Sequence, residues 1–447
     1  MNSQTRFPVP RRLPVAIVGG GYSGTILSAK LARRGIPSFL IDGSGRTGRG
    51  HAYSTLDPAH LLNVRADRMS AFADAPDHFA DAYEEAGGDR RGFAPRSFYG
   101  EYLGTILDQA TVEGGVIPVN SDALTARKID GRWQVGLSDG GVVEAELLVL
   151  AVGNQKPDSL PALAAAEECV IADPWGPDAR EAISRAAEDD LPVLLIGTGL
   201  TMVDAVLSLD AAGHSGRIVA VSRRGQVPFA HADFVPAPIG SEELPLGSLM
   251  GMWRWLRRRS EEVGWHAAVD SLRPHSQHIW KSWDLSQKRR FLRHARPWWD
   301  VRRHRTAPEA AAILNDRIAA SDLEIVAGRI GSAQCSDAGL DTEIRMRGTG
   351  ISRFDHFAFA INCTGPLHAI ARTRSPLLRD MLGQGLIRPD AHGIGAELDE
   401  GGEIVGANDL FAIGPLTKGR YWEITAVPDI REQASAIADT IAKRLAE

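Results

Sequence analysis

Cysteine is scarce in this sequence, and the spacing of the three that are present excludes two classes of protein. Cys169, Cys335 and Cys363 lie far apart in a chain of 447 residues, and no C-x-x-C pair occurs. A small disulfide-stabilised scaffold needs a dense set of cysteines, and a dithiol reductase needs two at close spacing. We therefore expect a reducing compartment, no disulfide framework and no paired redox-active dithiol.

Long apolar runs and metal-ligand spacings are also absent. No stretch of about 18 apolar residues occurs, and the polar, proline-rich N-terminus does not resemble a signal peptide. No H-E-x-x-H or other close cluster of metal ligands is found. The net charge of −6 argues against a general nucleic-acid binder. The sequence predicts a cytoplasmic protein with no metal, no membrane and no nucleic-acid partner, and it is compatible with a homo-oligomer.

A glycine-rich turn near the N-terminus is the strongest positive signal. Residues 15–18 are apolar and mostly β-branched, which is typical of a buried parallel strand. Gly19, Gly21 and Gly24 follow as G-x-G-x-x-G, and a helical pattern continues from Thr25. The first glycine permits a tight turn, the second lets backbone approach a pyrophosphate, and the third permits close helix–strand packing. This pattern predicts a dinucleotide-binding turn.

The residues around this turn strengthen the interpretation. Tyr22 and Ser23 lie inside the motif, at the start of the helix whose free N–H groups and positive dipole end would face the phosphates. A second apolar strand, residues 38–41, ends at Asp42, close to the expected offset for a carboxylate on the adenosine ribose. Because FMN has no such ribose, Asp42 favours FAD.

A second glycine motif begins after residue 192. The apolar residues 193–196 precede Gly197 and Gly199, while Met202 replaces the third glycine. The next strand ends not in an acid but in S-R-R-G, and Arg223 and Arg224 would attract the 2′-phosphate that a carboxylate repels. We expect this site to prefer NADPH, with NADH as the alternative. A competing interpretation is an empty duplicate whose arginines are merely solvated.

Strands that leave the two nucleotide motifs also repeat. The apolar segment 147–152 stops at Gly153, and the segment F-A-F-A-I-N-C-T-G-P at 357–366 resembles it. We predict an α/β fold with two Rossmann-like domains, in which an NAD(P) domain is inserted into a glutathione-reductase-like FAD domain. The expected boundaries are 12–156 and 366–447 for the FAD domain and 157–365 for the NAD(P) domain.

A segment rich in tryptophan and arginine interrupts the second domain. Seven of the ten tryptophans fall between residues 253 and 299, interleaved with basic residues. Such interleaving can bind single-stranded nucleic acid, but the negative net charge and the enzyme-like flanks favour a different interpretation. We expect a helical insertion at about 240–310 whose aromatic faces pack on the nucleotide domain.

Taken together, these segments resemble a bacterial FAD/NAD(P)-binding protein family that includes FAD-dependent urate hydroxylases. The resemblance spans almost the whole chain and lies in the segments V-A-I-V-G-G-G-Y-S-G, R-G-H-A-Y-S-T-L-D-P-A-H-L-L-N-V-R-A-D-R-M-S-A-F, F-A-P-R-S-F-Y-G-E-Y-L, V-L-L-I-G-T-G-L-T-M-V-D, S-R-R-G, R-P-W-W-D-V-R-R-H-R, I-N-C-T-G-P and G-P-L-T-K-G-R-Y-W-E-I-T-A-V-P-D-I-R. The chain lacks the F-x-G-x-x-x-H-x-x-x-[FWY] fingerprint of Baeyer–Villiger and related flavin monooxygenases, which argues against those groups.

The resemblance also implies site residues beyond the glycine motifs. It implies FAD contacts near Arg49, Asn63 and Gly414, and it places the N-terminus of the last helix, near Pro428, toward the flavin pyrimidine ring. Candidate substrate-side residues come from the segments between the motifs: His51, Tyr53, Arg68, Trp422 and Glu423. For Trp422, packing in a core is an equally good explanation.

The sequence therefore predicts an FAD- and NADPH-dependent monooxygenase. NADPH would reduce the flavin, which would react with oxygen and pass one oxygen atom to a small electron-rich substrate. Urate is the first candidate by resemblance, and an amino-acid or amine N-hydroxylase is the alternative. An NADPH-dependent flavin reductase or oxidase and a non-catalytic flavin-binding sensor remain as further alternatives.

Overall fold

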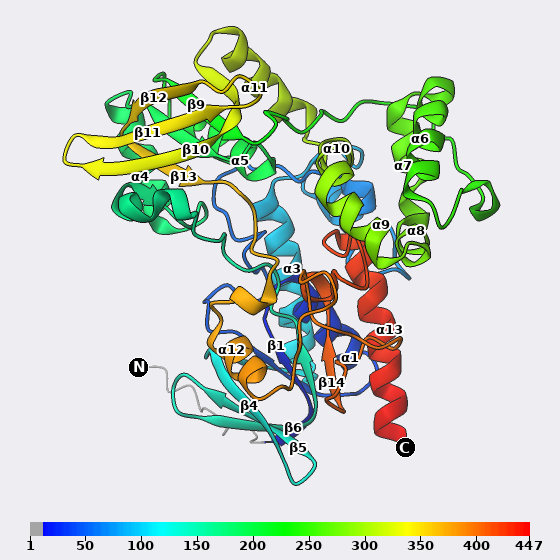
Figure 1. The fold of residues 1–447 in the computed structure, drawn as a ribbon. Coiled ribbons are helices and arrows are strands. Elements are labelled where there is room, and N and C mark those ends of the chain that lie inside the picture. Colours follow the sequence, from blue (N-terminus) through cyan, green and yellow to red (C-terminus); the bar gives the residue numbers. More distant parts are fainter. Residues whose placement is uncertain (1–11) are drawn as a thin grey trace. The chain divides into compact units, whose positions relative to one another are not determined.

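Two separate sheets organise the residues that the computed structural model describes, residues 12–447 (Figure 1). Unit 1 consists of the chain up to Leu56, Arg65–Gln155 and His368–Glu447. Unit 2 consists of Asp57–Val64 and Lys156–Leu367. The first unit therefore contains sequence segments from both ends of the chain.

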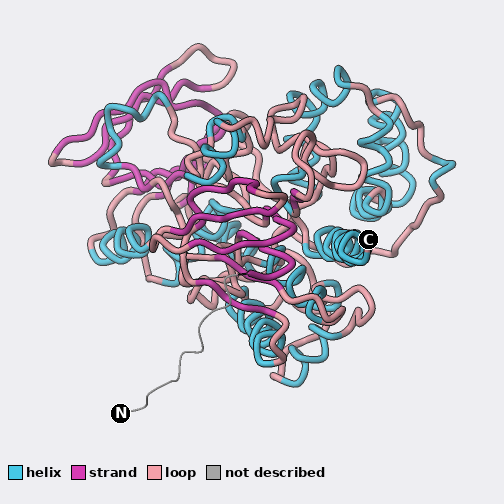
Figure 2. Tube along the Cα trace, turned by 90° about the horizontal axis from the view of Figure 1, so that it is seen from below, coloured by secondary structure: helices cyan, strands magenta, loops and turns pink. Residues whose placement is uncertain are grey.

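The sheet of unit 1 is built around the predicted first strand. Strand β1 (Arg12–Val18) pairs in parallel with β2 (Ser38–Ile41) on one side and with β6 (Val142–Leu150) on the other. Beyond them the sheet continues with two parallel strands and an antiparallel meander, namely β3 (Val116–Val119), β14 (Leu410–Ala412), β4 (Ala123–Ile129) and β5 (Arg132–Leu137) (Figure 2, magenta). Residues 15–18 are fully buried or nearly so, as their apolar character predicts.

Helices cover this sheet. Helix α1 (Tyr22–Ala32) packs against both α3 (Arg96–Val112) and the C-terminal α13 (Val427–Ala446), while α12 (Pro376–Gly383) packs on β4. Residues 77–111 contain two helices, because α2 (His78–Glu85) ends before a loop that precedes α3. That loop contains three glycines and a proline, which explains the interruption.

Unit 2 repeats the same arrangement around its own glycine motif. Strand β8 (Val193–Ile196) lies between β9 (Ile218–Ser222) and β13 (Phe359–Asn362), as β1 lies between β2 and β6. The remaining strands are β7 (Val170–Ile171), β10 (Leu323–Ser336), β11 (Gly339–Met346) and β12 (Ser352–Phe357). Mixed α/β structure with two parallel-rich sheets confirms the predicted fold class.

The helices of unit 2 include the predicted insertion. Helices α4 (Pro177–Glu188), α5 (Leu200–Ala211) and α11 (Pro308–Ala319) accompany the strands. Between β9 and α11 the chain forms α6 (Leu249–Val263), α7 (Trp265–Ser271), α8 (Ser276–Ser282), α9 (Leu285–Arg290) and α10 (Arg296–Arg303). Trp280, Trp283 and Phe291 pack together as a buried aromatic core of this insertion. These tryptophans are therefore structural.

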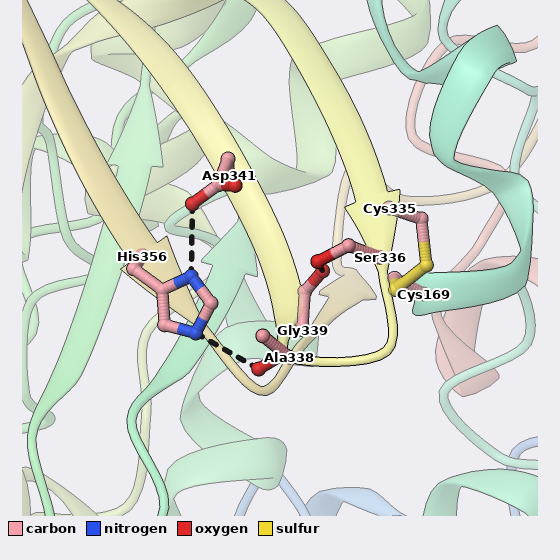
Figure 3. Close-up of a disulfide and its surroundings, with 7 residues drawn as sticks. All are labelled: Cys169, Cys335, Ser336, Ala338, Gly339, Asp341 and His356. Carbon is pink, nitrogen blue, oxygen red and sulfur yellow. Dashed lines mark hydrogen bonds and ion pairs between the residues drawn. A yellow bond between two sulfur atoms is a disulfide. The ribbon is translucent and has the colours of Figure 1, made fainter.

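The expectation of no disulfide is wrong. Cys169 and Cys335 form a disulfide that links the end of the short helix η2 (Pro161–Cys169) to β10, next to the β10–β11 turn (Figure 3). The two Cα atoms are 5.7 Å apart although 166 positions separate the residues in the sequence. Because folding, not sequence spacing, brings them together, the absence of a C-x-x-C motif did not exclude this bond. The inference of a reducing compartment can therefore no longer rest on an absence of disulfides.

None of the helices within residues 12–447 combines the length and apolar character that crossing a bilayer requires.

Candidate functional site

The glycine motif of unit 1 contains two glycines that the packing requires and one at which a Cβ would fit. Gly19 has φ +109°, and a Cβ there would overlap the carbonyl of Ala151, which follows β6. A Cβ on Gly24 would overlap the carbonyl oxygen of Gly19, well inside the 3.0 Å that real Cβ atoms keep. By contrast, a Cβ on Gly21 would meet only Gly50 Cα, at an ordinary 3.6 Å. The fold itself therefore requires Gly19 and Gly24 but not Gly21.

Helix α1 begins at this turn without a side-chain cap. Its N-cap residue is Gly21, which has no side chain to accept a hydrogen bond from the first N–H groups. An uncapped helix N-terminus next to a backbone approach route is suited to a phosphate, since the N–H groups and the helix dipole both attract an anion.

Asp42 fixes the shape of the glycine turn. One carboxylate oxygen accepts a hydrogen bond from Gly20 N at 2.7 Å, and the other accepts one from Ser44 N at 2.8 Å. The side chain is half-buried at the end of β2. Each carboxylate oxygen can accept a second hydrogen bond, so the predicted ribose contact is chemically compatible with this arrangement.

The loop after β2 folds back onto the glycine turn and onto α3. Gly48 N donates a hydrogen bond to the carbonyl of Gly20 at 2.8 Å. A Cβ on Gly100 of α3 would overlap the carbonyl of Tyr53 and lie 3.4 Å from Arg49 Cδ. Gly100 thus allows the loop to lie close to the helix, with Arg49 beside it. Gly100 was not predicted as a site residue, because no motif around it marks it as one.

The segment before α13 closes the other side of the α1 N-terminus. Gly414 has φ +73°, and a Cβ there would lie 2.6 Å from Ser23 Oγ. Its N–H donates to Gln433 Oε1 of α13 at 2.8 Å, and the Tyr22 hydroxyl donates to the carbonyl of Val427 at 3.3 Å. The predicted residues Tyr22, Ser23 and Gly414 are therefore brought together, and the N-terminus of α13 lies beside them.

A cluster of tyrosines adjoins this region, in which Tyr99 is buried and Tyr53 is half-buried. The ring of Tyr53 meets that of Tyr99 edge-on with centroids 4.7 Å apart, and the Tyr99 hydroxyl donates to the carbonyl of Met69 at 2.9 Å. Burial raises the pKa of Tyr53 to about 12 and raises the pKa of Tyr99 as well. Both phenols are consequently neutral at physiological pH and can act as hydrogen-bond donors.

Glu423 and Trp422 lie in the buried loop that leads to α13. Glu423 is 4% exposed, and its backbone has φ +72°, a conformation that non-glycine residues rarely adopt. Trp422 is 5% exposed, and Lys418 Nζ lies 5.2 Å from its ring centroid. A buried carboxylate on strained backbone is found most often at functional sites, where the surrounding structure maintains the strain.

The remaining candidates of the first motif region are more dispersed. His51 Nδ1 lies 3.4 Å from Arg46 Nη1 in the loop after β2. Arg68 is exposed at the end of the short helix η1 (Ala66–Arg68). Asn63 belongs to unit 2, where its carbonyl accepts a hydrogen bond from His231 Nε2 at 3.0 Å. Gly153 follows β6 with φ +64°, three residues beyond the strand's end.

The glycine motif of unit 2 shows the same division. Gly197 has φ +118°, and a Cβ there would overlap the carbonyl of Cys363, which follows β13. A Cβ on Gly199 would meet no atom within 4 Å. Gly199 is also the N-cap of α5, which has no side-chain cap. As in unit 1, the first glycine is required by the fold and the second leaves a route to an uncapped helix N-terminus.

Ser222 holds the turn that carries the two predicted arginines. Its hydroxyl accepts hydrogen bonds from Thr198 Oγ1 at 2.8 Å and from Gly225 N at 3.0 Å. This ties the end of β9 to the glycine turn after β8. Arg223 is exposed and Arg224 is half-buried on this turn, so their guanidinium groups are available to a ligand at the carboxyl ends of β8 and β9.

Comparison with protein families identifies the N-terminal motif region. Residues 16–155 match a family model described as FAD-NAD(P)-binding. This match confirms the predicted FAD/NAD(P)-binding domain. No curated protein sequence matches the chain.

Solved structures with the same architecture cover nearly the whole chain. L-lysine 6-monooxygenase from Pseudomonas syringae is 17% identical over 96% of this chain and 99% of that chain, with a TM-score of 0.66. Ornithine N-hydroxylase from Kutzneria sp. 744, with reduced FAD, NADP+ and L-ornithine, is 16% identical over 97% and 100%, with a TM-score of 0.63. Bacillithiol disulfide reductase from Bacillus cereus is 15% identical over 97% and 99%, with a TM-score of 0.58. At these identities the likeness establishes the two-domain FAD/NAD(P)-binding fold.

Proposed function

We propose that the chain is an FAD-dependent monooxygenase that consumes NADPH and inserts one oxygen atom into a small substrate. The observation that carries the proposal is the pair of glycine turns, each with a sterically open middle glycine before an uncapped helix. They lie in a fold similar to that of two amino-acid monooxygenases, one of which was solved with reduced FAD and NADP+.

The residues of unit 1 fit FAD. Gly21 leaves space for a pyrophosphate at the α1 N-terminus, and Asp42 retains acceptor capacity for a ribose. The N-terminus of α13 lies beside Gly414 and favours negative charge on a neighbouring ring, an effect of about 0.3–1 kcal/mol when exposed and up to about 2 kcal/mol when partly buried. FAD, when bound, would supply the hydride acceptor and the reaction with oxygen.

Three residues of unit 1 are assigned substrate-side roles. The buried Glu423 carboxylate would bind a cationic or proton-donating group of the substrate. Trp422 would exclude water from the reacting centre. The neutral phenol of Tyr53 would donate a hydrogen bond. His51 and Arg68 remain predictions.

For the substrate, an amine of an amino acid is the first candidate. The structural neighbours include a lysine and an ornithine monooxygenase, and a buried carboxylate such as Glu423 suits a cationic substrate. Urate, suggested by the sequence resemblance, is the second candidate. An NADPH-dependent reductase is the competing function, since a disulfide reductase shares the fold.

The test is NADPH consumption by purified protein carrying FAD, with L-lysine, L-ornithine, urate and a disulfide as separate additions. A monooxygenase consumes NADPH faster with its substrate, releases less peroxide, and forms hydroxylated product in proportion. Stoichiometric peroxide that no compound alters would indicate an oxidase. Oxygen-independent NADPH consumption that requires the disulfide would indicate a reductase. Flavin that NADPH does not reduce would indicate a sensor.

A further inference from the structure

The β10–β11 hairpin returns the chain to the end of β9. Strand β10 pairs in parallel with β9 up to Ala327, which lies opposite Ser222, and then pairs with the antiparallel β11. Strand β11 ends at Met346, and the next residue, Arg347, donates its backbone N–H to the carbonyl of Ala327 at 2.9 Å. Arg347 is therefore anchored to the neighbour of the strand that carries the S-R-R-G turn.

The S-R-R-G turn contacts the same residue. Gly225 has φ +61°, and a Cβ there would lie 3.1 Å from Ala327 N, so the turn packs closely on β10. Ala327 is thus the common support of the turn with Arg223 and Arg224 and of Arg347. More than 120 residues separate Arg347 from the turn along the chain, and the hairpin removes that separation in space.

In the part of the chain that the structure describes, these three arginines have no anionic partner. Within residues 12–447, none of Arg223, Arg224 and Arg347 forms an ion pair, whereas Arg345 on β11 is paired with Glu343 at 3.1 Å. Burial lowers the pKa of Arg224, and the positive charges of Arg347 and Arg223 lower it further. Like charges that lie near each other without a counter-ion repel each other, and a bound anion would relieve this repulsion.

We propose that Arg347 is the third cationic contact of the nucleotide site in unit 2, binding the 2′-phosphate of NADPH together with Arg223 and Arg224. The ligand class is a phosphate monoester on an adenosine ribose, whose several oxygens can accept hydrogen bonds from more than one guanidinium group. This assignment rests on the proposed NADPH site. It means that the turn after β9 and the end of the β10–β11 hairpin form that site together.

The test measures binding of two probes to purified protein by calorimetry. Adenosine 2′,5′-bisphosphate and adenosine 5′-monophosphate differ only in the 2′-phosphate. Arg347→Ala should weaken binding of the bisphosphate about fivefold to tenfold and change binding of the monophosphate less than about twofold. Arg347→Lys should recover part of the loss. Arg345→Ala, which removes the same charge two residues away, is the matched control and should bind both probes like the wild type.

Stability separates a binding role from a structural one. Because Arg347 repels Arg224 in the unliganded protein, Arg347→Ala should leave unliganded thermal stability unchanged or raise it slightly. Loss of stability together with equal weakening for both probes would overturn the proposal. Wild-type affinity of Arg347→Ala for the bisphosphate would also overturn it. In that case, if Arg223→Ala/Arg224→Ala binds the bisphosphate more weakly than the wild type, the proposed NADPH site stands without Arg347. If the wild-type protein binds the two probes with equal affinity, the NADPH site is refuted too.

Discussion

In each glycine motif, packing requires the first glycine but leaves room for a side chain at the middle one. A glycine-to-alanine substitution should therefore affect stability most at a position that packing requires, and ligand binding most at the middle position. Gly24→Ala places a Cβ inside the carbonyl oxygen of Gly19, so α1 and the turn must move apart. Overpacking of this kind costs about 1–3 kcal/mol or more. Gly21→Ala places its Cβ at an ordinary 3.6 Å from Gly50 Cα, on extended backbone with φ −77° and ψ −171°. Its cost is that of a poorer helix N-cap, about 0.5–1 kcal/mol.

For FAD binding, Gly21→Ala should have the larger effect of the two substitutions. Gly21→Ala keeps the fold but blocks close approach of backbone to the pyrophosphate, which removes one or two charge-assisted hydrogen bonds worth about 1.5–3 kcal/mol each. We expect FAD affinity to fall at least about tenfold. Because a bound ligand stabilises the native protein by RT ln(1 + [L]/Kd), a tenfold loss of affinity lowers this stabilisation by about 1.4 kcal/mol. The unfolding temperatures of holoprotein and apoprotein should therefore lie closer together in this variant than in the wild type.

Two measurements check this reasoning on the same samples. The flavin-to-protein ratio after gel filtration reports FAD retention, and urea unfolding of apoprotein reports stability. Gly199→Ala is the matched control in unit 2, because its Cβ meets no atom within 4 Å and Gly199 is also a helix N-cap. Its stability should fall only by the same N-cap cost of about 0.5–1 kcal/mol, and its FAD content should stay as in the wild type while NADPH binds less tightly. Undiminished FAD affinity of Gly21→Ala, or wild-type stability of apo Gly24→Ala, would refute the division.

Three further predictions follow from the two units. Replacing Arg223 and Arg224 by alanine should remove most of the preference for NADPH over NADH, a loss of about tenfold or more, measured as the ratio of kcat/KM for the two nucleotides. Glu423→Gln should retain FAD and lower kcat/KM about tenfold or more with the true substrate, because a charge-assisted hydrogen bond contributes about 1.5–3 kcal/mol; an unchanged kcat/KM would remove Glu423 from the site. Asp341 raises the pKa of His356, whose ring nitrogens face Asp341 Oδ1 and the carbonyl of Ala338 at 2.8 and 3.0 Å. The protonated ring satisfies both, so this stabilisation is complete below the unfolded histidine pKa of about 6.5 and is lost as pH rises through the higher folded-state value. Urea unfolding of wild type and His356→Gln at pH 5.5 and 8.5 should show the larger difference at pH 5.5.

Local signals were sufficient for the nucleotide-binding framework. Strand β1 could be predicted because a buried parallel strand is apolar throughout, and the turn after it because only glycine tolerates φ +109° against the carbonyl of Ala151. The exit strands β6 and β13 could be recognised because the same packing problem recurs in both units. In each case the constraint acts within a few residues or repeats along the chain.

Features that depend on long-range approach could not be predicted in this way. The Cys169–Cys335 disulfide depends on where η2 meets β10, and no spacing rule encodes that approach. In the sequence, Gly100 cannot be distinguished from any other helix glycine. Only the fold shows that the loop with Tyr53 lies against it. Segment Asp57–Val64 joins unit 2 through buried polar contacts, such as His60 Nε2 to Ser208 Oγ at 2.9 Å. The sequence of the segment does not predict these contacts.

The same distinction bears on whether the second nucleotide motif is an empty duplicate. A duplicate kept only for its fold would need Gly197, whose Cβ cannot be accommodated, but would gain nothing from Gly199, where a side chain would meet only open space. It would also gain nothing from three clustered arginines, because their mutual repulsion destabilises the unliganded state. An anionic nucleotide makes both features favourable at once, since it uses the open backbone route and neutralises the arginines. Open glycine and unpaired charge therefore support a working nucleotide site in unit 2.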